Sequence, residues 1–295
     1  MLQIFRLFAE VLNSLAVSIL PVPEIVLPLA ISFFTFQQIA YLVDVYEGQK
    51  AEIKFVRYAL FVSFFPQLIA GPIVHHYQIL PQYSHLHGSR EQMRLFNQGI
   101  TLFALGLSKK ILLADTAARY ASPIFDGVAG GSAVSFFEAW VGTISYSFQI
   151  YFDFSGYSDM AIGLGLMFGF KLPINFLSPY RAPSIIDFWK RWHITLSQFL
   201  RDYLYIPLGG SRNGDIRKYY NILITMILGG LWHGAGNTFL LWGGLHGMFI
   251  ITNHLWRRSF SEVEFLQGKL AKAFMVAFTF LLVSIAWVFF RAESV

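Results

Sequence analysis

The chain lacks cysteine and is poor in charge. Only 13% of its 295 residues are charged, against about 25% in soluble domains, and 55% are hydrophobic. Without cysteine, disulfide bonds, thiolate metal sites and a cysteine nucleophile are all excluded. The mean hydropathy of +0.52 lies outside the soluble range. The composition therefore indicates one membrane domain with little room for an extramembrane one.

Several catalytic and binding motifs are also missing. The sequence contains no G-x-S-x-G elbow, no P-loop, no H-E-x-x-H and no histidine followed five positions later by aspartate. The run GLGLMFG has the wrong spacing for a dinucleotide loop and lies in an apolar stretch, so we interpret it as helix packing. We expect no metal site and no bound cofactor.

The net charge of +5 does not indicate nucleic-acid binding. A membrane protein collects Lys and Arg in cytoplasmic loops, where they face anionic lipid. Because no soluble basic face is present, we expect no nucleic-acid partner.

Long apolar stretches predict an all-α, multi-spanning integral membrane bundle, since a crossing takes about 20 residues. A stretch at 57–74 contains Pro66 and Pro72, so it is expected to be broken or re-entrant. Residues 155–171 form a shorter Gly-rich run. The clear spans are 24–43, 132–152, 219–233, 237–253 and 270–290, with 57–74 and 96–114 as further candidates.

Residues 172–218 are rich in Lys and Arg, which places them on the cytoplasmic side. Within them, 184–206 predicts one amphipathic helix capped by Ser184, with Asp187 and Arg191 paired four residues apart. Its expected apolar stripe is Phe188, Trp192, Leu196, Phe199 and Tyr203.

His233 is the leading candidate for chemistry. It lies in GGLWHGAG at the end of an apolar span, where an ionisable residue is costly and suggests function. A packing histidine bonded to a backbone carbonyl is the alternative. The pairs Gly230 with Gly234, and Gly243 with Gly247, predict close helix approach.

The other ionisable candidates are weaker. His193 is either functional or an interfacial histidine, and His246 is expected to serve packing. Asp153 and Asp159 suit acid–base work but are more easily explained as structural. The remaining histidines are expected to be solvated in a polar loop; they are His75, His76, His85 and His87.

Five segments together carry a family resemblance. They are ISFFTFQQIAYLVDVYEG, FFPQLIAGPIV, DFSGYSDMAIGLGLMFGFKLPINF, DFWKRWHITLSQFLRDYLYIPLGGSR and GGLWHGAGNTFLLWGGLHG, in this order. The chain resembles bacterial membrane-bound O-acyltransferases of the alginate O-acetyltransferase branch, from about residue 28 to residue 292. The segment YIPLGGSR favours the polysaccharide O-acetylating branch over the D-alanyl-transferring one.

The resemblance implies a ring of tilted helices around a tunnel, with re-entrant pieces, in a bacterial inner membrane. It assigns the invariant family histidine to His233 and a second motif histidine to His193. Acetyl-CoA would supply the acyl group from the cytoplasm, and a periplasmic partner protein or a polysaccharide hydroxyl would receive it. Residues 1–295 would form a single acyltransferase core that lacks the terminal helices of the full family.

The roles follow as expectations. Neutral His233 would be the general base, and His193 would orient CoA or line the tunnel entrance. Arg181, Lys190, Arg191 and Arg201 are available to hold CoA phosphates, although cytoplasmic topology alone also explains them. A transporter without bond-forming chemistry and an inactive scaffold remain as alternatives. The absence of an internal repeat disfavours the transporter.

Overall fold

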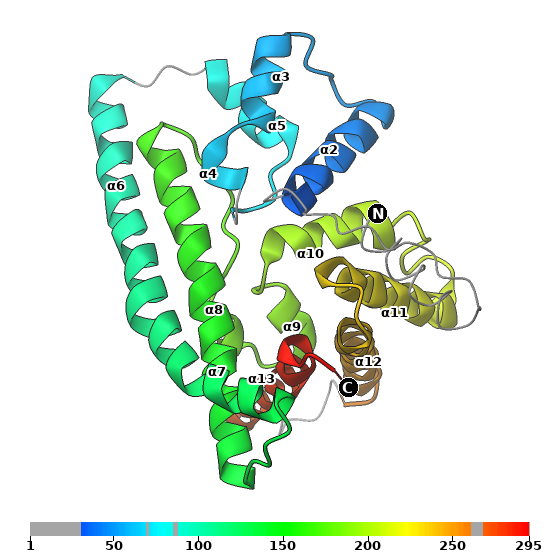
Figure 1. Cartoon of the computed structure of the whole chain (residues 1–295). Coiled ribbons are helices and arrows are strands. Elements are labelled where there is room, and N and C mark those ends of the chain that lie inside the picture. The colour runs from blue at the N-terminus through cyan, green and yellow to red at the C-terminus, as the bar shows by residue number, and fades with distance from the viewer. Residues whose placement is uncertain (1–30, 69–70, 85–87, 261–267, 295) are drawn as a thin grey trace, which may run out of the picture.

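The structure is a computed structural model that describes residues 31–68, 71–84, 88–260 and 268–294. These residues contain helices and loops but no strand, so the predicted all-helical class is confirmed. The arrangement appears in Figure 1, where α6 (Ser89–Ser108) and α8 (Phe136–Met167) lie together along one side of the molecule and the other helices lie beside them.

The first described part consists of short pieces. The helix α2 (Ile31–Tyr46) is followed by α3 (Phe55–Val62) and α4 (Phe65–Leu68). The predicted break in 57–74 is confirmed, since α3 ends before Pro66 and α4 is one turn long. The next pieces are α5 (His76–Ile79) and the 3-10 helix η1 (Leu80–Ser84).

Two long helices form one side of the molecule (Figure 1). They are α6 (Ser89–Ser108) and α8 (Phe136–Met167), joined by the π-helix η2 (Lys109–Ala114) and α7 (Asp115–Ala129). A Cβ atom on Gly99 would meet the Gly163 carbonyl oxygen at 2.5 Å, so α6 and α8 touch backbone to backbone.

The helix α8 corrects one prediction. The expected span 132–152 and the Gly-rich run 155–171 belong mostly to this single helix of 32 residues. The helix continues through its glycines, and Gly156 and Gly163 lie against α6, where their lack of a side chain permits the contact. Asp153 and Asp159 pair with Lys110 and Lys109, which supports their structural interpretation.

The predicted single helix over 184–206 is wrong. The structure has α9 (Ile185–Trp189), α10 (Ile194–Leu200) and the π-helix η4 (Arg201–Tyr205) instead. The break falls at His193, whose backbone is left-handed with φ of 42°. At this break the backbone forms hydrogen bonds with the preceding segment 175–177. The Leu177 amide donates to the Arg191 carbonyl, and the Ile194 amide donates to the Asn175 carbonyl.

Other details of that prediction are confirmed. Ser184 caps α9 by accepting from the Asp187 amide, and Arg191 pairs with Asp187 at 2.8 Å. In the apolar stripe, Phe188, Trp192, Leu196 and Phe199 are all buried. The hydrophobic pattern thus identified the buried side chains, but the helix that carries them is broken.

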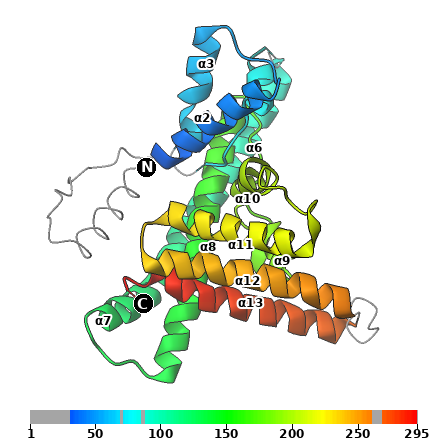
Figure 2. The same cartoon turned by 90° about the vertical axis from the view of Figure 1, so that its right-hand side faces the viewer.

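Three helices complete the fold: α11 (Gly214–His233), α12 (Asn237–Phe260) and α13 (Lys269–Arg291). Figure 2 shows them running side by side. Of the described helices, α13 alone is long and apolar enough to cross a membrane, in agreement with the span predicted at 270–290. The short 3-10 helix η3 (Pro179–Arg181) packs against α13 and α9.

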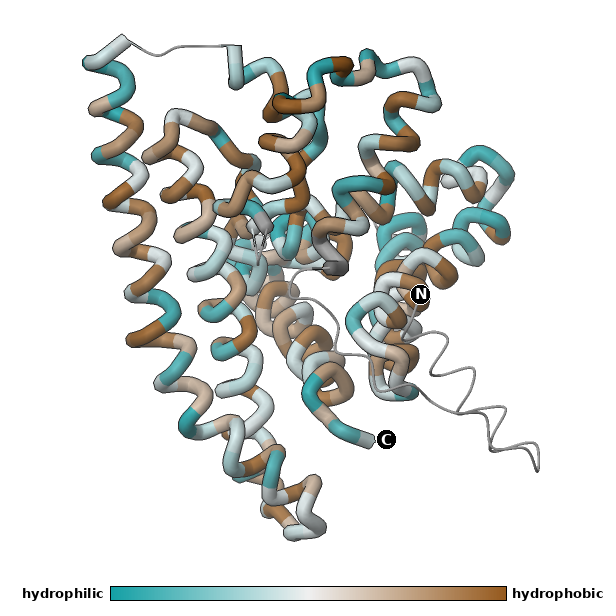
Figure 3. The backbone as a smooth tube through the Cα atoms, turned by 45° about the horizontal axis from the view of Figure 1, so that its top comes forward, coloured by the Kyte–Doolittle hydropathy of each residue, from teal (hydrophilic) through white to brown (hydrophobic). Residues whose placement is uncertain are grey.

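Aromatic side chains fill the space between these elements. One buried cluster joins α9 to α12 and α13 through Phe188, Trp192, Trp242 and Trp287. Figure 3 shows hydrophobic residues along the length of the long helices, interrupted by short hydrophilic stretches. This aromatic cluster lies beside the candidate site.

Candidate active site

His233 is the last residue of α11, where the chain turns through the loop before α12. Its ring is half-buried among aromatic rings from three helices. The ring centroids lie 4.5 Å from Trp232, 5.3 Å from Trp242 and 4.9 Å from Phe290. These contacts hold the imidazole in place while leaving part of it accessible.

Glycines allow α11 and α12 to cross closely next to His233. A Cβ on Gly230 would meet the Phe239 carbonyl oxygen at 2.3 Å, and one on Gly243 would meet the Met226 carbonyl oxygen at 2.4 Å. A Cβ on Gly234 would meet the Phe239 ring, also at 2.3 Å. The close approach predicted from these small residues is therefore confirmed.

His193 is almost fully buried, with 2% of its surface exposed. Its Nδ1 lies 3.1 Å from the side-chain oxygen of Asn175, and its ring meets that of Phe154 edge to face at 4.7 Å. Its Nε2 is buried and has no hydrogen-bond partner among the described residues. An unpaired buried nitrogen is costly in a protein interior and is a feature of sites that receive a ligand.

The structure brings the two predicted histidines together. His193 precedes α10 and His233 ends α11, 40 positions later in the chain, yet the two helices pack together, since Trp232 beside His233 contacts the cluster of Leu196 and Leu200 in α10. Such a pair of imidazoles can accept, hold and return a proton. The sequence could not show this convergence, because it depends on the break at His193.

His246 is buried with no exposed surface, as its packing interpretation predicts. The Trp189 indole N–H donates to its Nδ1 at 3.3 Å, and its ring packs on Trp242 at 4.9 Å. Trp242 thus lies between His233 and His246, with ring contacts to both.

A cavity of about 440 Å³ opens between α9, α10, η4, α11 and α12. Its wall includes Trp189, whose ring lies 5.9 Å from that of Trp242, the neighbour of His233. Arg201, Lys218 and His254 line the same cavity beside apolar residues such as Met226. The cavity therefore combines cationic groups with an apolar wall, two aromatic rings away from His233.

The sequence model described as the membrane-bound O-acyltransferase family matches residues 48–292, which include both histidines. This chain belongs to the membrane-bound O-acyltransferase family. A peptidoglycan O-acetyltransferase of Helicobacter pylori is 47% identical, over 92% of this chain and 55% of that protein. A protein of Azotobacter vinelandii named probable alginate O-acetylase is 44% identical, over 96% of this chain and 54% of that protein.

More distant relatives carry another activity in their name. A teichoic acid D-alanyltransferase of Streptococcus thermophilus is 27% identical, over 78% of this chain and 57% of that protein. The chain spans about half the length of the curated relatives it matches.

The four cationic side chains predicted to bind the phosphates of CoA do not all line the same cavity. Arg201 lines the cavity beside Trp189, where it also pairs with the neighbouring Asp202 at 2.7 Å. Arg191 pairs with Asp187, while Arg181 and Lys190 are exposed. The structure adds Lys218, which the sequence reasoning counted only as cytoplasmic charge.

The prediction of solvated histidines at residues 75 and 76 is wrong. His75 is 5% exposed and His76 is 3% exposed, and both face Asp44 of α2. The Tyr203 hydroxyl contacts both Asp44 and the His75 Nδ1. The partner carboxylate lies more than thirty positions earlier, so local spacing could not indicate it; His85 and His87 lie outside the described residues.

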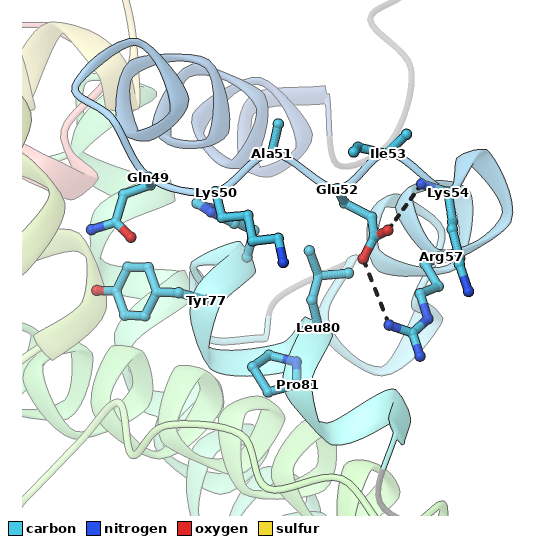
Figure 4. Close-up of a pocket in the computed structure, with 11 residues that line it drawn as sticks. Gln49, Lys50, Ala51, Glu52, Ile53, Lys54, Arg57, Tyr77, Leu80 and Pro81 are labelled. Atoms are coloured by element: carbon cyan, nitrogen blue, oxygen red, sulfur yellow. Dashed lines mark hydrogen bonds and ion pairs between the residues drawn. The ribbon is translucent and has the colours of Figure 1, made fainter.

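A second cavity of about 440 Å³ adjoins this buried cluster and contains neither His193 nor His233. Figure 4 shows it between residues 49–57, which include the first turn of α3, and residues 77–81, with the Arg57 guanidinium directed toward Glu52. His76 forms part of its wall, which gives this buried imidazole a route to solvent.

Among the described residues, no group of three or more His, Asp and Glu side chains could hold a metal ion. Sequence reasoning missed Asn175 and Trp242, which contact the two candidate histidines directly. Both lie in segments that carry the family resemblance, but nothing in their local sequence singles out either side chain for a site. Only the fold places them there.

Proposed function

We propose that this chain forms the membrane core of an O-acetyltransferase that moves acetyl groups from acetyl-CoA toward hydroxyl groups of an envelope or extracellular polysaccharide. The observation that carries the proposal is that His193 and His233 lie on elements that pack together, with His233 two aromatic rings from a cavity with cationic and apolar walls. The names of the relatives at 44% and 47% identity support acetyl as the acyl group.

The chemistry is an acyl exchange between a thioester and an alcohol. Neutral His233 accepts the hydroxyl proton while the hydroxyl oxygen attacks the acetyl carbonyl carbon. A C–O bond forms, the C–S bond breaks, and the proton returns to the leaving thiolate to give free CoA and the O-acetyl ester. No cysteine is available to carry the acetyl group, so a direct transfer within the site fits this chain.

The donor is proposed to bind in the cavity lined by Arg201 and Lys218. Cationic side chains suit the phosphates of CoA, and the apolar wall suits its slender arm. Trp189 in the wall packs on Trp242, which packs on His233, so this cavity approaches the proposed base through two rings. Arg181, Lys190 and Arg191 would attract the phosphates from farther away.

We place the cavity entrance on the cytoplasmic side of a bacterial inner membrane, because the basic stretch 172–218 supplies much of its wall. The short pieces α3 and α4 would form a re-entrant part of a ring of helices around a tunnel. A polysaccharide hydroxyl, or a periplasmic protein that passes the acetyl group on, would be the acceptor.

Acetyl transfer is preferred to D-alanyl transfer because the relatives named for D-alanyl transfer are 25% and 27% identical, well below those named for O-acetylation. A transporter or a scaffold has no need for a buried and a half-buried histidine on elements that pack together. These alternatives therefore lack a structural observation in their favour.

Membranes that contain the full-length protein should be incubated with CoA carrying a radiolabelled acetyl group. We expect label in alkali-labile esters of the polysaccharide fraction. Acetyl-CoA labelled only in the adenine ring is the control and should leave no label there. If acetyl label never exceeds that of membranes without the protein, for either polysaccharide or protein, the proposed function is wrong.

A further inference from the structure

Asn175 is buried with none of its surface exposed, and its side-chain oxygen is a meeting point for three groups. The Thr195 backbone nitrogen lies 3.3 Å from this oxygen, the Thr195 hydroxyl 3.0 Å and the His193 Nδ1 3.1 Å. The side-chain nitrogen of Asn175 faces the Ser158 hydroxyl at 3.3 Å.

The donors and acceptors in this network can be assigned from groups that have only one role. A backbone N–H only donates, so the Asn175 atom that faces the Thr195 amide is the oxygen. The Ile73 amide donates to the Thr195 hydroxyl oxygen at 3.0 Å, which leaves the hydroxyl proton to point at Asn175. The orientation of the Asn175 carboxamide is thereby fixed.

The tautomer of His193 follows from that orientation. Because the Asn175 oxygen only accepts, the His193 Nδ1 must carry a proton and donate it. In a neutral imidazole the other nitrogen then holds a lone pair. This Nε2 is the buried nitrogen that has no hydrogen-bond partner among the described residues.

The backbone supports the same arrangement. His193 has a left-handed φ of 42°, which a residue with a side chain rarely adopts. The Asn175 carbonyl accepts from the Ile194 amide at 2.9 Å, immediately after His193. Asn175 thus holds this histidine through both its backbone and its side chain.

We propose that Asn175 is a positioning residue that locks His193 in the Nδ1–H tautomer, so that its Nε2 presents a lone pair to the site as a hydrogen-bond acceptor. This inference rests on the proposed function and deepens it. A lone pair cannot donate to a phosphate or a carbonyl oxygen. His193 therefore accepts a hydrogen bond from a donor group in the site, while the hydroxyl proton goes to His233 and the CoA phosphates are held by other groups.

The tautomer can be measured without any assay of activity. The full-length protein is labelled with ¹⁵N-histidine in lipid bilayers, and the two ring nitrogens of His193 are assigned by comparison with His193→Gln. Solid-state NMR near neutral pH should show a protonated Nδ1 and an unprotonated Nε2. The opposite pattern would overturn the proposal even if the wild type transfers acetyl groups.

Variants then separate positioning from general support of the fold. Asn175→Leu keeps the approximate volume but removes the acceptor, and should lower kcat about 10–100-fold, the range found for orienting partners of metal-bound histidines. Asn175→Asp keeps an acceptor for Nδ1. It should retain more activity than Asn175→Leu and shift the acidic limb of the pH profile to higher pH, because a nearby carboxylate favours the imidazolium.

Asn221→Leu is the matched control, since Asn221 is equally buried but bonds the Gly210 carbonyl instead of a histidine. It should lower protein yield without moving the pH profile of the protein that remains. Equal activity and identical pH profiles for Asn175→Asp and Asn175→Leu would contradict the positioning role. If neither Asn175 variant folds, the wild-type NMR measurement still decides. A wild type that shows the expected tautomer but no acetyl transfer would reject the proposed function alone.

Discussion

Tyr203 donates its hydroxyl proton to the carboxylate of Asp44, a residue 159 positions earlier in the chain, over 2.5 Å. This contact joins η4, which follows the broken helix next to the candidate site, to the end of α2. The His75 ring stacks on Tyr203 and faces the same carboxylate. The basic segment that lines the cavity beside Trp189 is thereby attached to the first described helix.

Tyr203→Phe should destabilise the protein, because it removes a hydrogen bond to a buried charged group. Such bonds contribute about 1.5–3 kcal/mol. Thermal unfolding in detergent, followed by fluorescence, measures the change. Tyr77→Phe is the control, since the Tyr77 ring also stacks on His75. In contrast to Tyr203, the Tyr77 side chain is half exposed. Equal stability losses for the two variants would show that the Asp44 contact is unimportant.

The buried side chain of His76, beside Asp44, predicts that the stability of the protein depends on pH. Burial lowers the pKa of His76 below its usual 6.5, although Asp44 opposes the shift. Above pH 6.5, His76 is neutral in both the folded and the unfolded chain, so its contribution to the stability of the folded chain is fully present. As the pH falls below 6.5, the unfolded chain takes up the proton first and stability is lost.

His76→Gln should therefore flatten the dependence of the unfolding midpoint on pH between about 7 and 5, the range around the usual histidine pKa. The wild-type side chain forms part of a cavity wall. Wild type and variant are compared in one detergent at constant ionic strength. Parallel curves would mean that His76 titrates alike in the folded and unfolded chain.

Two adjacent glycines of α12 should respond oppositely to a methyl group. Gly243→Ala would place a Cβ 2.4 Å from the Met226 carbonyl oxygen, so α11 and α12 would have to move apart. We expect a loss of about 1–3 kcal/mol, as for other overpacked sites. Gly244 has no neighbour within 4 Å of such an atom.

Gly244→Ala should therefore be neutral or stabilise by up to about 1 kcal/mol through helix propensity. The two unfolding midpoints in detergent, measured side by side, test the crossing of the helices. Destabilisation by both substitutions, or by neither, would contradict this helix packing.

The sequence predicted the helical class, the burial of the aromatic stripe and the close approach at Gly243, because these depend on local periodicity and residue size. It also identified His193 and His233 as candidates. It did not predict the break at His193, because the backbone bonds to residues 175–177 that cause it are not visible in a helical pattern. The partners of His75 and His76 were missed for the same reason, since Asp44 and Tyr203 come from distant segments.

The central claim is that His233 is the base for acetyl transfer. In the full-length protein, His233→Ala should insert into the membrane normally but lose about 10²–10⁴-fold in the rate of transfer, the usual loss for a general base. His76→Gln is the control, a buried histidine outside the site that should lose stability but keep its specific activity. The decisive measurement is the rate of radiolabelled acetyl transfer per folded molecule in membranes that carry each variant. Retention of more than about a tenth of the wild-type rate by His233→Ala would contradict the account.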